Sequence, residues 1–243
     1  MINPNINKEI ASLWHKHFDK YESGKTPVSE EEFGKIKAPM FYDKPKQGGI
    51  LFVGMNPSFT PKANNILKKE YPEEIKNPSE YYLWNNTKNN EEKINRMIEI
   101  EKKWLEKYPS YFKPMIEITN SIELKNKYFQ HIDLFIYRET NQPNFIEKIY
   151  IKGELNEFGK DQMEIFDKVL NSLSPEVIVV ANAKASKIFK QEYKMDDKMN
   201  KSTGFYFKGE IPIFFSGMLS GRRALDIHSR ERLIWHIKKS ISP

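Results

Sequence analysis

Residues 49–58 read Gly-Ile-Leu-Phe-Val-Gly-Met-Asn-Pro-Ser, an apolar run between two glycines followed by an Asn-Pro pair. Such a run is typical of a short strand buried on both faces, which is the kind of strand found in parallel sheets. Pro57 has no backbone N–H and a fixed φ, so the chain leaves the sheet at this point. Asn56 is therefore predicted to stand just beyond the carboxyl end of a buried strand.

Three further apolar segments are predicted strands, and predicted helices separate them. The strands cover residues 131–138, 177–181 and 211–215. Apolar residues at helical spacing predict helices over 91–107, 162–173, 183–189 and 225–241, and an earlier one marked by Ile10, Leu13, Trp14, Phe18 and Tyr21. In the last helix, the expected apolar face consists of Ile227, Ile234, Ile237 and Ile241. This alternation indicates an α/β three-layer sandwich around a central, largely parallel four-stranded sheet.

Length and composition limit the possible classes of protein. The chain has 243 residues, of which 39% are hydrophobic and 13% aromatic, enough for a packed core. We expect a single domain over residues 1–243, with a polar helical insertion at about residues 60–115. The absence of cysteine excludes a disulfide scaffold, a cysteine-ligated metal and a thiol nucleophile. The five histidines show no metal-ligand spacing and no phosphate loop or dinucleotide motif occurs, so we expect neither a metal nor a cofactor.

Charge and hydropathy bear on partners and location. No apolar run approaches the roughly 20 residues that span a bilayer, and the opening residues MINPNINKEI lack a signal-peptide pattern. We therefore expect a cytoplasmic monomer with no membrane association. The net charge of +6 and the isoelectric point of about 9.1 favour a polyanionic partner, although soluble Lys-rich proteins often share such values.

Polar residues gather where the predicted strands end. Asn56, Asn182 and the 216–223 loop each follow a predicted strand, and Asp133 lies within the remaining one. Ligands of parallel sheets bind beyond the carboxyl ends of the strands, so this convergence is the main functional signal. A carboxylate in an apolar strand needs a partner. Asp133 is therefore either paired structurally, with Arg138 or His131, or used for ligand binding.

The strand-end motifs resemble those of the uracil-DNA glycosylase superfamily. Gly54-Met55-Asn56-Pro57-Ser58 is similar to its first motif in the Gly-x-Asn-Pro form. Residues 175–185 resemble its penultimate core strand, and residues 215–220 lie where its second motif belongs. The resemblance spans roughly residues 48–58 and 130–240. It implies a cofactor-independent DNA glycosylase that flips a modified or damaged base out of DNA and hydrolyses its bond to deoxyribose.

The resemblance also implies roles for individual residues. Asn56 would position the attacking water and Asp133 would read the base, and these two form the implied catalytic pair. Asn56 can orient a water but cannot act as a general base as Asp can. The implied base-binding residues are Gly54, Met55, Pro57, Ser58, Phe135 and Asn182, with the Phe135 ring stacking on the base.

The predicted substrate follows from Asp133. A carboxylate only accepts hydrogen bonds, so it suits the exocyclic amine of cytosine. Because normal cytosine must be spared, a modified cytosine is the economical inference. The superfamily includes antiviral enzymes that attack phage DNA carrying glucosylated hydroxymethylcytosine, and the departures of this chain from the family pattern are compatible with that branch.

The second motif departs from the family pattern. Family members commonly begin this loop with His or Asn, whereas Phe215 or Ser216 stands here. Leu219 resembles the wedge that fills the gap left by a flipped base, and its alternative is an ordinary core leucine. The other implied DNA contacts are Ser216, Met218, Ser220, Arg222, Arg223 and His228.

Three other interpretations remain open. The enzyme could excise uracil or mismatched thymine in DNA repair. The chain could be a non-catalytic module that keeps the fold and binds nucleic acid, since it lacks the family's His. An unrelated α/β hydrolase is the third, although residues 216–221 do not supply a Gly-x-Ser-x-Gly nucleophile turn.

Overall fold

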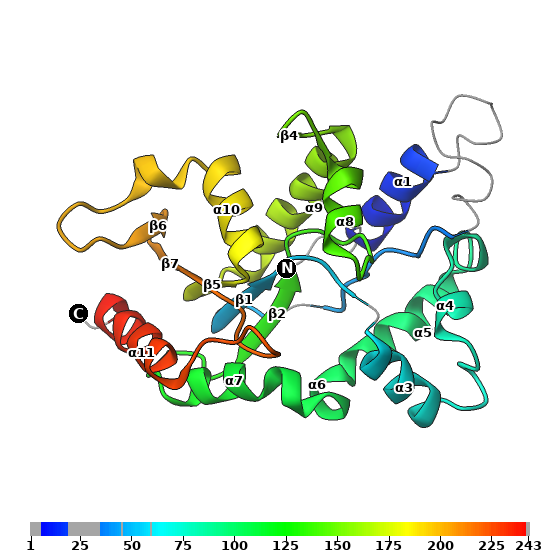
Figure 1. The fold of residues 1–243 in the computed structure, drawn as a ribbon, viewed down its shortest axis with the longest axis horizontal. Helices are drawn as coiled ribbons and strands as arrows, with labels where there is room; N and C mark the ends of the chain where they lie inside the picture. The colour runs from blue at the N-terminus through cyan, green and yellow to red at the C-terminus, as the bar shows by residue number, and fades with distance from the viewer. Residues whose placement is uncertain (1–5, 19–34, 45, 59, 242–243) are drawn as a thin grey trace. The chain divides into compact units, whose positions relative to one another are not determined.

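The computed structural model describes residues 6–18, 35–44, 46–58 and 60–241 (Figure 1). The chain folds into two compact units that alternate along the sequence. The helical unit contains residues 1–45, 56–108 and 135–169, and the sheet unit contains residues 46–55, 109–134 and 170–243. Among the described residues, no helix combines the length and apolarity needed to cross a membrane.

The sheet unit contains a five-stranded sheet in the order β2-β1-β5-β7-β6. The strands are β1 (Ile50–Gly54), β2 (Phe129–Asp133), β5 (Val177–Ala181), β6 (Tyr206–Lys208) and β7 (Ile211–Ser216). All neighbouring pairs are parallel except β6 and β7. The expected α/β class and largely parallel sheet are confirmed, but the expected count of four strands is wrong. Gly209, at φ +63°, lets the chain turn tightly between β6 and β7. β6 can therefore pair with β7 as the fifth strand of the sheet.

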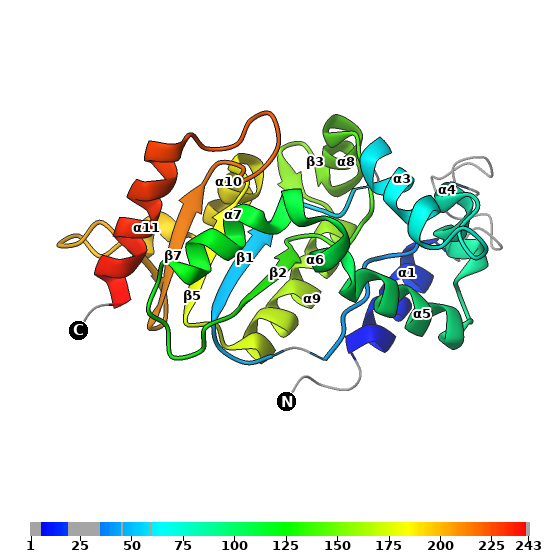
Figure 2. The same cartoon turned by 90° about the horizontal axis from the view of Figure 1, so that it is seen from below.

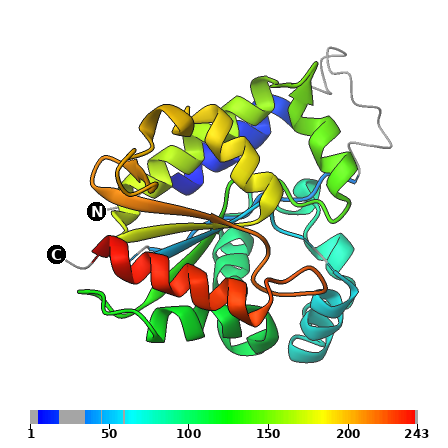
Figure 3. The same ribbon diagram turned by 60° about the vertical axis from the view of Figure 1, so that its left-hand side comes forward.

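Helices cover both faces of this sheet. α7 (Pro109–Asn120) and α11 (Ile227–Ile241) pack on one face, and α10 (Ala183–Glu192) packs against β5 and β7 from the other (Figure 2, Figure 3). Alternate residues of each strand therefore face opposite helix layers. The core under α7 and α11 consists of Ile50, Phe52, Met115, Ile118, Ile122, Val177, Val179, Phe214, Leu219, Leu233 and Ile237. The sheet unit is thus a three-layer α/β arrangement.

The helical unit consists mainly of short amphipathic helices. They are α1 (Ile6–Phe18), α3 (Pro61–Glu70), α4 (Pro78–Tyr81), α5 (Glu91–Lys102), α6 (Trp104–Lys107), α8 (Gln142–Ile149) and most of α9 (Glu157–Leu173). A small antiparallel hairpin joins β3 (Tyr150–Ile151) to β4 (Glu154–Leu155). The core of the helical unit includes an aromatic cluster in which Trp14 contacts Phe18, Tyr137 and Phe158.

Several predicted elements differ in their limits. The helix expected over 91–107 is divided into α5 and α6 at Lys103. The span 60–115, expected as one insertion, contributes α3 to α6 to the helical unit and the start of α7 to the sheet unit. Tyr21, assigned to the first helix, lies outside the described residues.

The strand expected over 131–138 ends at Asp133. The following residues are buried but pair outside the sheet: the Gln162 side-chain oxygen accepts hydrogen bonds from the backbone N–H groups of Ile136 and Tyr137, at 3.1 and 3.0 Å. An apolar run signals burial, and here a glutamine from α9 satisfies the backbone instead of a neighbouring strand. The prediction was therefore wrong in length because burial alone does not distinguish a strand from a buried irregular segment.

A buried ion pair ties α5 to this segment within the helical unit. The Arg138 guanidinium contacts the Glu101 carboxylate, and both side chains are less than one-tenth exposed. Arg138 Nε also donates to the Ala38 carbonyl oxygen at 3.0 Å, and its guanidinium lies over the Tyr82 ring. Pairing with Arg138 was one structural alternative considered for Asp133, and Glu101 is an acidic partner of Arg138 in the structure.

Candidate functional site

The carboxyl ends of the four parallel strands meet at one edge of the sheet. Gly54 of β1 pairs with Asp133 of β2, and Ala181 of β5 pairs with Ser216 of β7. Asn182 follows directly after β5. Within the sheet unit, the predicted site residues Gly54, Asp133, Asn182 and Ser216 therefore occupy the same edge. For Asp133 this differs from the prediction, which placed it inside a strand over 131–138.

Gly54 and Asp133 are in close contact across β1 and β2. A Cβ atom added to Gly54 would lie 2.1 Å from Asp133 Oδ1 and 3.1 Å from His131 Nε2. Asp133 is 6% exposed. The glycine of the Gly-x-Asn-Pro string thus provides the space that the carboxylate occupies, and no other residue type fits there without moving it.

Two aromatic groups extend this polar cluster. His131 lies two residues before Asp133, so both side chains are on the same face of β2. Tyr111 Oη of α7 lies 3.1 Å from His131 Nε2, within hydrogen-bond distance. Burial lowers the pKa of His131 to about 4, so its imidazole is neutral at pH 7. The sequence analysis considered His131 only as a partner of Asp133, although its two-residue spacing from Asp133 places both on one face of a strand. It missed Tyr111, which is distant in sequence and carries no such signal.

Asn182 has a local structural role. Its Oδ1 accepts hydrogen bonds from the backbone N–H groups of Lys184 and Ala185, at 2.9 and 3.1 Å, and so caps α10. This cap uses the oxygen that a base donor would need. Asn182 therefore caps α10 through Oδ1, and a role of its Nδ2 donor in base binding stays a prediction.

The helical unit holds Asn56 in a defined orientation. Its Nδ2 donates to the backbone oxygens of Glu139 at 2.7 Å, Pro57 at 3.2 Å and Tyr137 at 3.3 Å. Hydrogen bonds found among the described residues use Nδ2 and leave Oδ1 as the remaining polar atom of the side chain. The amide therefore has one fixed rotamer and one acceptor for a further donor.

The other implied base-binding residues differ widely in exposure. Met55 is 5% exposed, and the backbone oxygen of Pro57 accepts a hydrogen bond from Glu139 N at 3.1 Å. Ser58 is exposed. Phe135 is fully buried and packs edge-to-face on Phe145. Phe135 is a core residue of the helical unit, so its assignment to base stacking is corrected.

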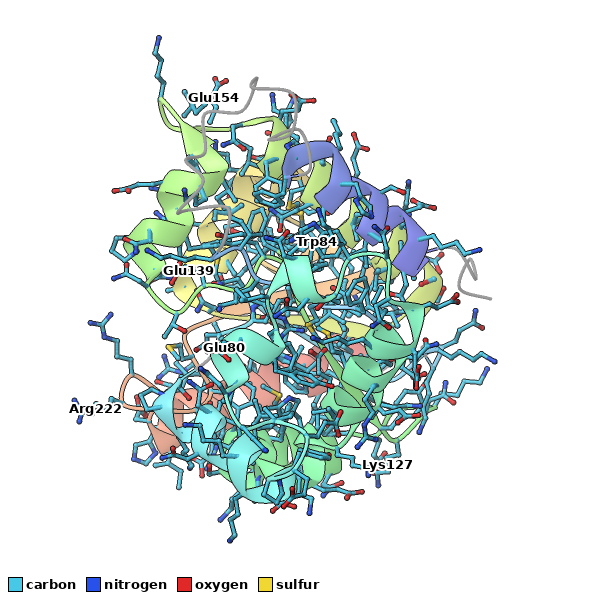
Figure 4. The ribbon with its side chains drawn as sticks, turned by 90° about the vertical axis from the view of Figure 1, so that its right-hand side faces the viewer. Glu80, Trp84, Lys127, Glu139, Glu154 and Arg222 are labelled. Atoms are coloured by element: carbon cyan, nitrogen blue, oxygen red, sulfur yellow. The ribbon has the colours of Figure 1, made fainter. Side chains whose placement is uncertain are left out.

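The loop between β7 and α11 presents cations at its tip. Leu225 N donates to the Met218 carbonyl oxygen at 2.8 Å, and Met218 and Ala224 form a β-bridge that closes the loop. Arg222 and Arg223 are exposed beyond this closure, and Figure 4 shows the Arg222 side chain pointing outward from the ribbon. The closed loop thus displays two guanidinium groups.

Within this loop the structure reverses the roles of two apolar residues. Leu219 is 5% exposed and belongs to the core under α7 and α11, whereas Met218 is 37% exposed. The wedge assignment of Leu219 is therefore corrected, because a wedge must reach the nucleic acid. Ser216 is half-buried, and its hydroxyl donates to the Gly217 carbonyl oxygen at 2.9 Å. Ser220 is half-buried as well.

The outer face of α11 carries an aromatic side chain that the sequence analysis missed. Trp235 is 55% exposed, and Ile227, expected on the apolar face, is 57% exposed. The buried residues are Leu233 and Ile237. The His228 imidazole is exposed and lies 3.6 Å from a Glu231 carboxylate oxygen. Ile234 and Ile241 pack against the same core as Ile237, so the predicted apolar face is confirmed for three of its four isoleucines and is wrong for Ile227.

The ligand-binding chemistry available is that of hydrogen bonds and charge. Across the part of the chain that the structure describes, no three acidic or histidine side chains gather in a metal-binding group. The sheet edge offers a buried carboxylate and a neutral imidazole, and the β7–α11 loop offers exposed guanidinium groups. Searches of protein-family models and of curated proteins return no match for this chain.

Proposed function

We propose that this protein is a DNA glycosylase that hydrolyses the bond between deoxyribose and a flipped-out modified cytosine, such as phage glucosylated hydroxymethylcytosine, and leaves an abasic site. The observation that carries the proposal is the placement of the Asp133 carboxylate against Gly54 at the carboxyl edge of the sheet. The superfamily resemblance assigns base reading to this position, and Asp133 supplies an acceptor there.

The carboxylate favours cytosine over uracil. A carboxylate has several lone-pair sites and no donor, so it accepts from the exocyclic amine of cytosine and repels the carbonyl oxygen that uracil presents at the same position. Acceptance of one structural hydrogen bond leaves capacity for another. The neutral His131 nearby adds no positive charge that would offset this preference.

The state of Asn56 supports water positioning. Its Nδ2 protons are directed to backbone oxygens, which fixes the side chain and leaves Oδ1 to accept from a water. An amide oxygen orients a water without removing its proton, so the reaction depends on the oxocarbenium character of the departing sugar rather than on a strong base. We therefore propose that excision is slow.

The proposal is tested by a base-excision panel. Oligonucleotides carrying glucosylated hydroxymethylcytosine, hydroxymethylcytosine, uracil, mismatched thymine or normal cytosine are incubated with the protein, and alkali then cleaves abasic sites. We expect cleavage at a modified cytosine, none at normal cytosine, and loss of cleavage in Asn56→Ala. Cleavage at uracil alone would overturn the assigned substrate and support the repair alternative.

A second candidate function is nucleic-acid binding without catalysis. The observation that favours it is the same set of three Asn56 hydrogen bonds, because they give this side chain a structural role that requires no reaction. Retention of DNA binding with no cleavage at any base of the panel would select this candidate over the glycosylase.

A further inference from the structure

The exposed face of α11 combines an aromatic ring with cations at helical spacing. Trp235 is 55% exposed. Arg232 lies three residues before it, and Lys238 and Lys239 lie three and four residues after it, so all three share its side of the helix, as does the acidic Glu231 four residues before it. Lys239 Nζ lies 5.8 Å from the indole centroid. This group, called the Trp235 face below, consists of Arg232, Trp235, Lys238 and Lys239.

Neighbouring aromatic rings hold the Trp235 indole in place. The His236 ring meets it nearly edge-on, with centroids 4.9 Å apart. His236 in turn contacts Phe205 edge-on at 5.8 Å. A large side chain held by neighbouring rings loses little conformational entropy when a ligand stacks on it. The exposed part of the indole is therefore suited to stacking.

The surrounding charge is strongly positive. Residues 216–241 include six Lys and Arg residues and two Asp and Glu residues, whereas the whole chain has 39 Lys and Arg residues and 33 Asp and Glu residues. Arg230 is paired with Glu117 at 2.8 Å, and Asp226 accepts hydrogen bonds from Ser229 at the start of α11. Arg222 and Arg223 lie on the loop that precedes the same helix. The Trp235 face is thus continuous in sequence with the cationic loop.

This chemistry distinguishes among classes of partner. Aromatic anchors of protein–protein interfaces lie in centres from which charged residues, lysine above all, are depleted, whereas cations flank Trp235. In duplex DNA the bases are stacked on one another, and an indole has no free base face to contact. A single strand supplies both the unstacked base and the phosphates that lysine and arginine bind.

We propose that the Trp235 face binds single-stranded DNA, with one base stacked on the indole and adjacent phosphates contacted by Arg232, Lys238 and Lys239. From Arg232 to Lys239 the helix rises about 10 Å, enough for contacts to neighbouring nucleotides. The proposal rests on the proposed glycosylase function and extends it, because it names the form of DNA that the protein holds.

The test uses the full chain and an unmodified, fluorescein-labelled oligo-dT, with binding measured by anisotropy. Trp235→Ala is expected to weaken binding about five- to 150-fold, the range for loss of one base–aromatic stack. Trp235→Phe keeps a stacking ring, so its affinity should stay within a few-fold of wild type while the ligand-induced quenching of tryptophan fluorescence falls. The matched control is Ile151→Ala, which removes another exposed apolar side chain, 61% exposed in the helical unit, and should leave affinity unchanged.

Because oligo-dT contains no excisable base, this measurement and the excision panel can fail separately. Unchanged affinity in Trp235→Ala would overturn the inference, as would an equal loss of affinity for single strands and for duplex. Self-association of the protein that depends on Trp235, without oligonucleotide binding, would assign the face to a second copy of the chain and would also overturn it.

Discussion

The Asp133 carboxylate occupies the space in which a side chain at position 54 would lie: a Cβ built on Gly54 comes 2.1 Å from Asp133 Oδ1. The two residues are register partners on β2 and β1. The position of the buried Asp133 carboxylate therefore depends on the absence of a side chain at Gly54. This contact links the motif that suggested the function to the residue that suggested the substrate.

Gly54→Ala should displace the Asp133 side chain. Overpacking of this kind costs roughly 1–3 kcal/mol of unfolding free energy, and if Asp133 reads the base, excision should fall with it. Urea denaturation measures the first effect. Asp133→Ala removes the obstructing group, so the double variant should be less destabilised than the sum of the single variants. Strict additivity of the two changes would contradict the proposed contact.

Asn56→Asp should lower the free energy of unfolding, although a carboxylate at this position could act as a general base, which the amide cannot. A carboxylate cannot donate to the oxygens of Glu139, Pro57 and Tyr137, so the substitution places like partial charges together. We expect a loss of about 1–3 kcal/mol of unfolding free energy. A stability equal to wild type would show that the three hydrogen bonds contribute nothing.

Asn141→Asp is the matched control for this change. Asn141 caps α8 through its Oδ1, which accepts from Asn144 N at 3.1 Å. A carboxylate preserves an acceptor, so this variant should be as stable as wild type or slightly more so. The pair of variants separates an amide used as a donor from one used as an acceptor.

Stability should fall on acidification because of His131. Its pKa is lowered to about 4 in the folded protein by burial, whereas an unfolded histidine titrates near 6.5. Between these values the unfolded chain binds a proton that the folded chain does not, so the free energy of unfolding decreases as pH decreases. His131→Gln should reduce this dependence by about 2–3 kcal/mol between pH 6.5 and 4.

The exposed His228 provides the comparison for that experiment. His228→Gln changes the same residue type on the surface of α11 and should retain the wild-type dependence on pH. Denaturation midpoints measured across the pH range give both slopes. Identical slopes in His131→Gln and wild type would mean that His131 is not held neutral by the fold.

Substitution of Arg222 and Arg223 by Gln should weaken DNA binding at every sequence. Loss of each phosphate contact reduces the slope of log affinity against log salt by about 0.9 on duplex and 0.7 on single strands. Lys68→Gln with Lys69→Gln removes equal charge from exposed positions on α3 and should leave the slope nearly unchanged. An equal effect of both double variants would indicate a response to net charge alone.

Strong hydrophobic signals in the sequence predicted the sheet well. The runs at Ile50–Val53 and Val177–Val180 gave β1 and β5 because each is bounded by turn residues and buried on both faces. β6 is only three residues long and half-buried, so it lacks such a signal. Its pairing with β7 depends on the tight turn at Gly209, and the sequence does not indicate that turn until the position of β7 is known.

The candidate site was predicted by position along the strands but not by side-chain direction. Gly54 was placed correctly at the sheet edge, whereas Asp133 was placed inside a strand that was predicted to continue to residue 138 and lies at the edge because β2 ends there. Strand order cannot tell whether Phe135 or Leu219 points inward, and both are core residues. On α11, the isoleucine spacing correctly placed Ile234, Ile237 and Ile241 against the core, but it did not show that Ile227 and Trp235 are exposed.

The measurement that tests the central claim most directly is a comparison of wild type and Asp133→Asn on matched oligonucleotides carrying glucosylated hydroxymethylcytosine or uracil. An amide can donate to a uracil carbonyl as well as accept, whereas the carboxylate only accepts. We predict that wild type excises the modified cytosine and spares uracil, and that Asp133→Asn loses the first activity and gains preference for uracil. An unchanged ratio of the two activities, or excision of neither base by wild type, would contradict the account.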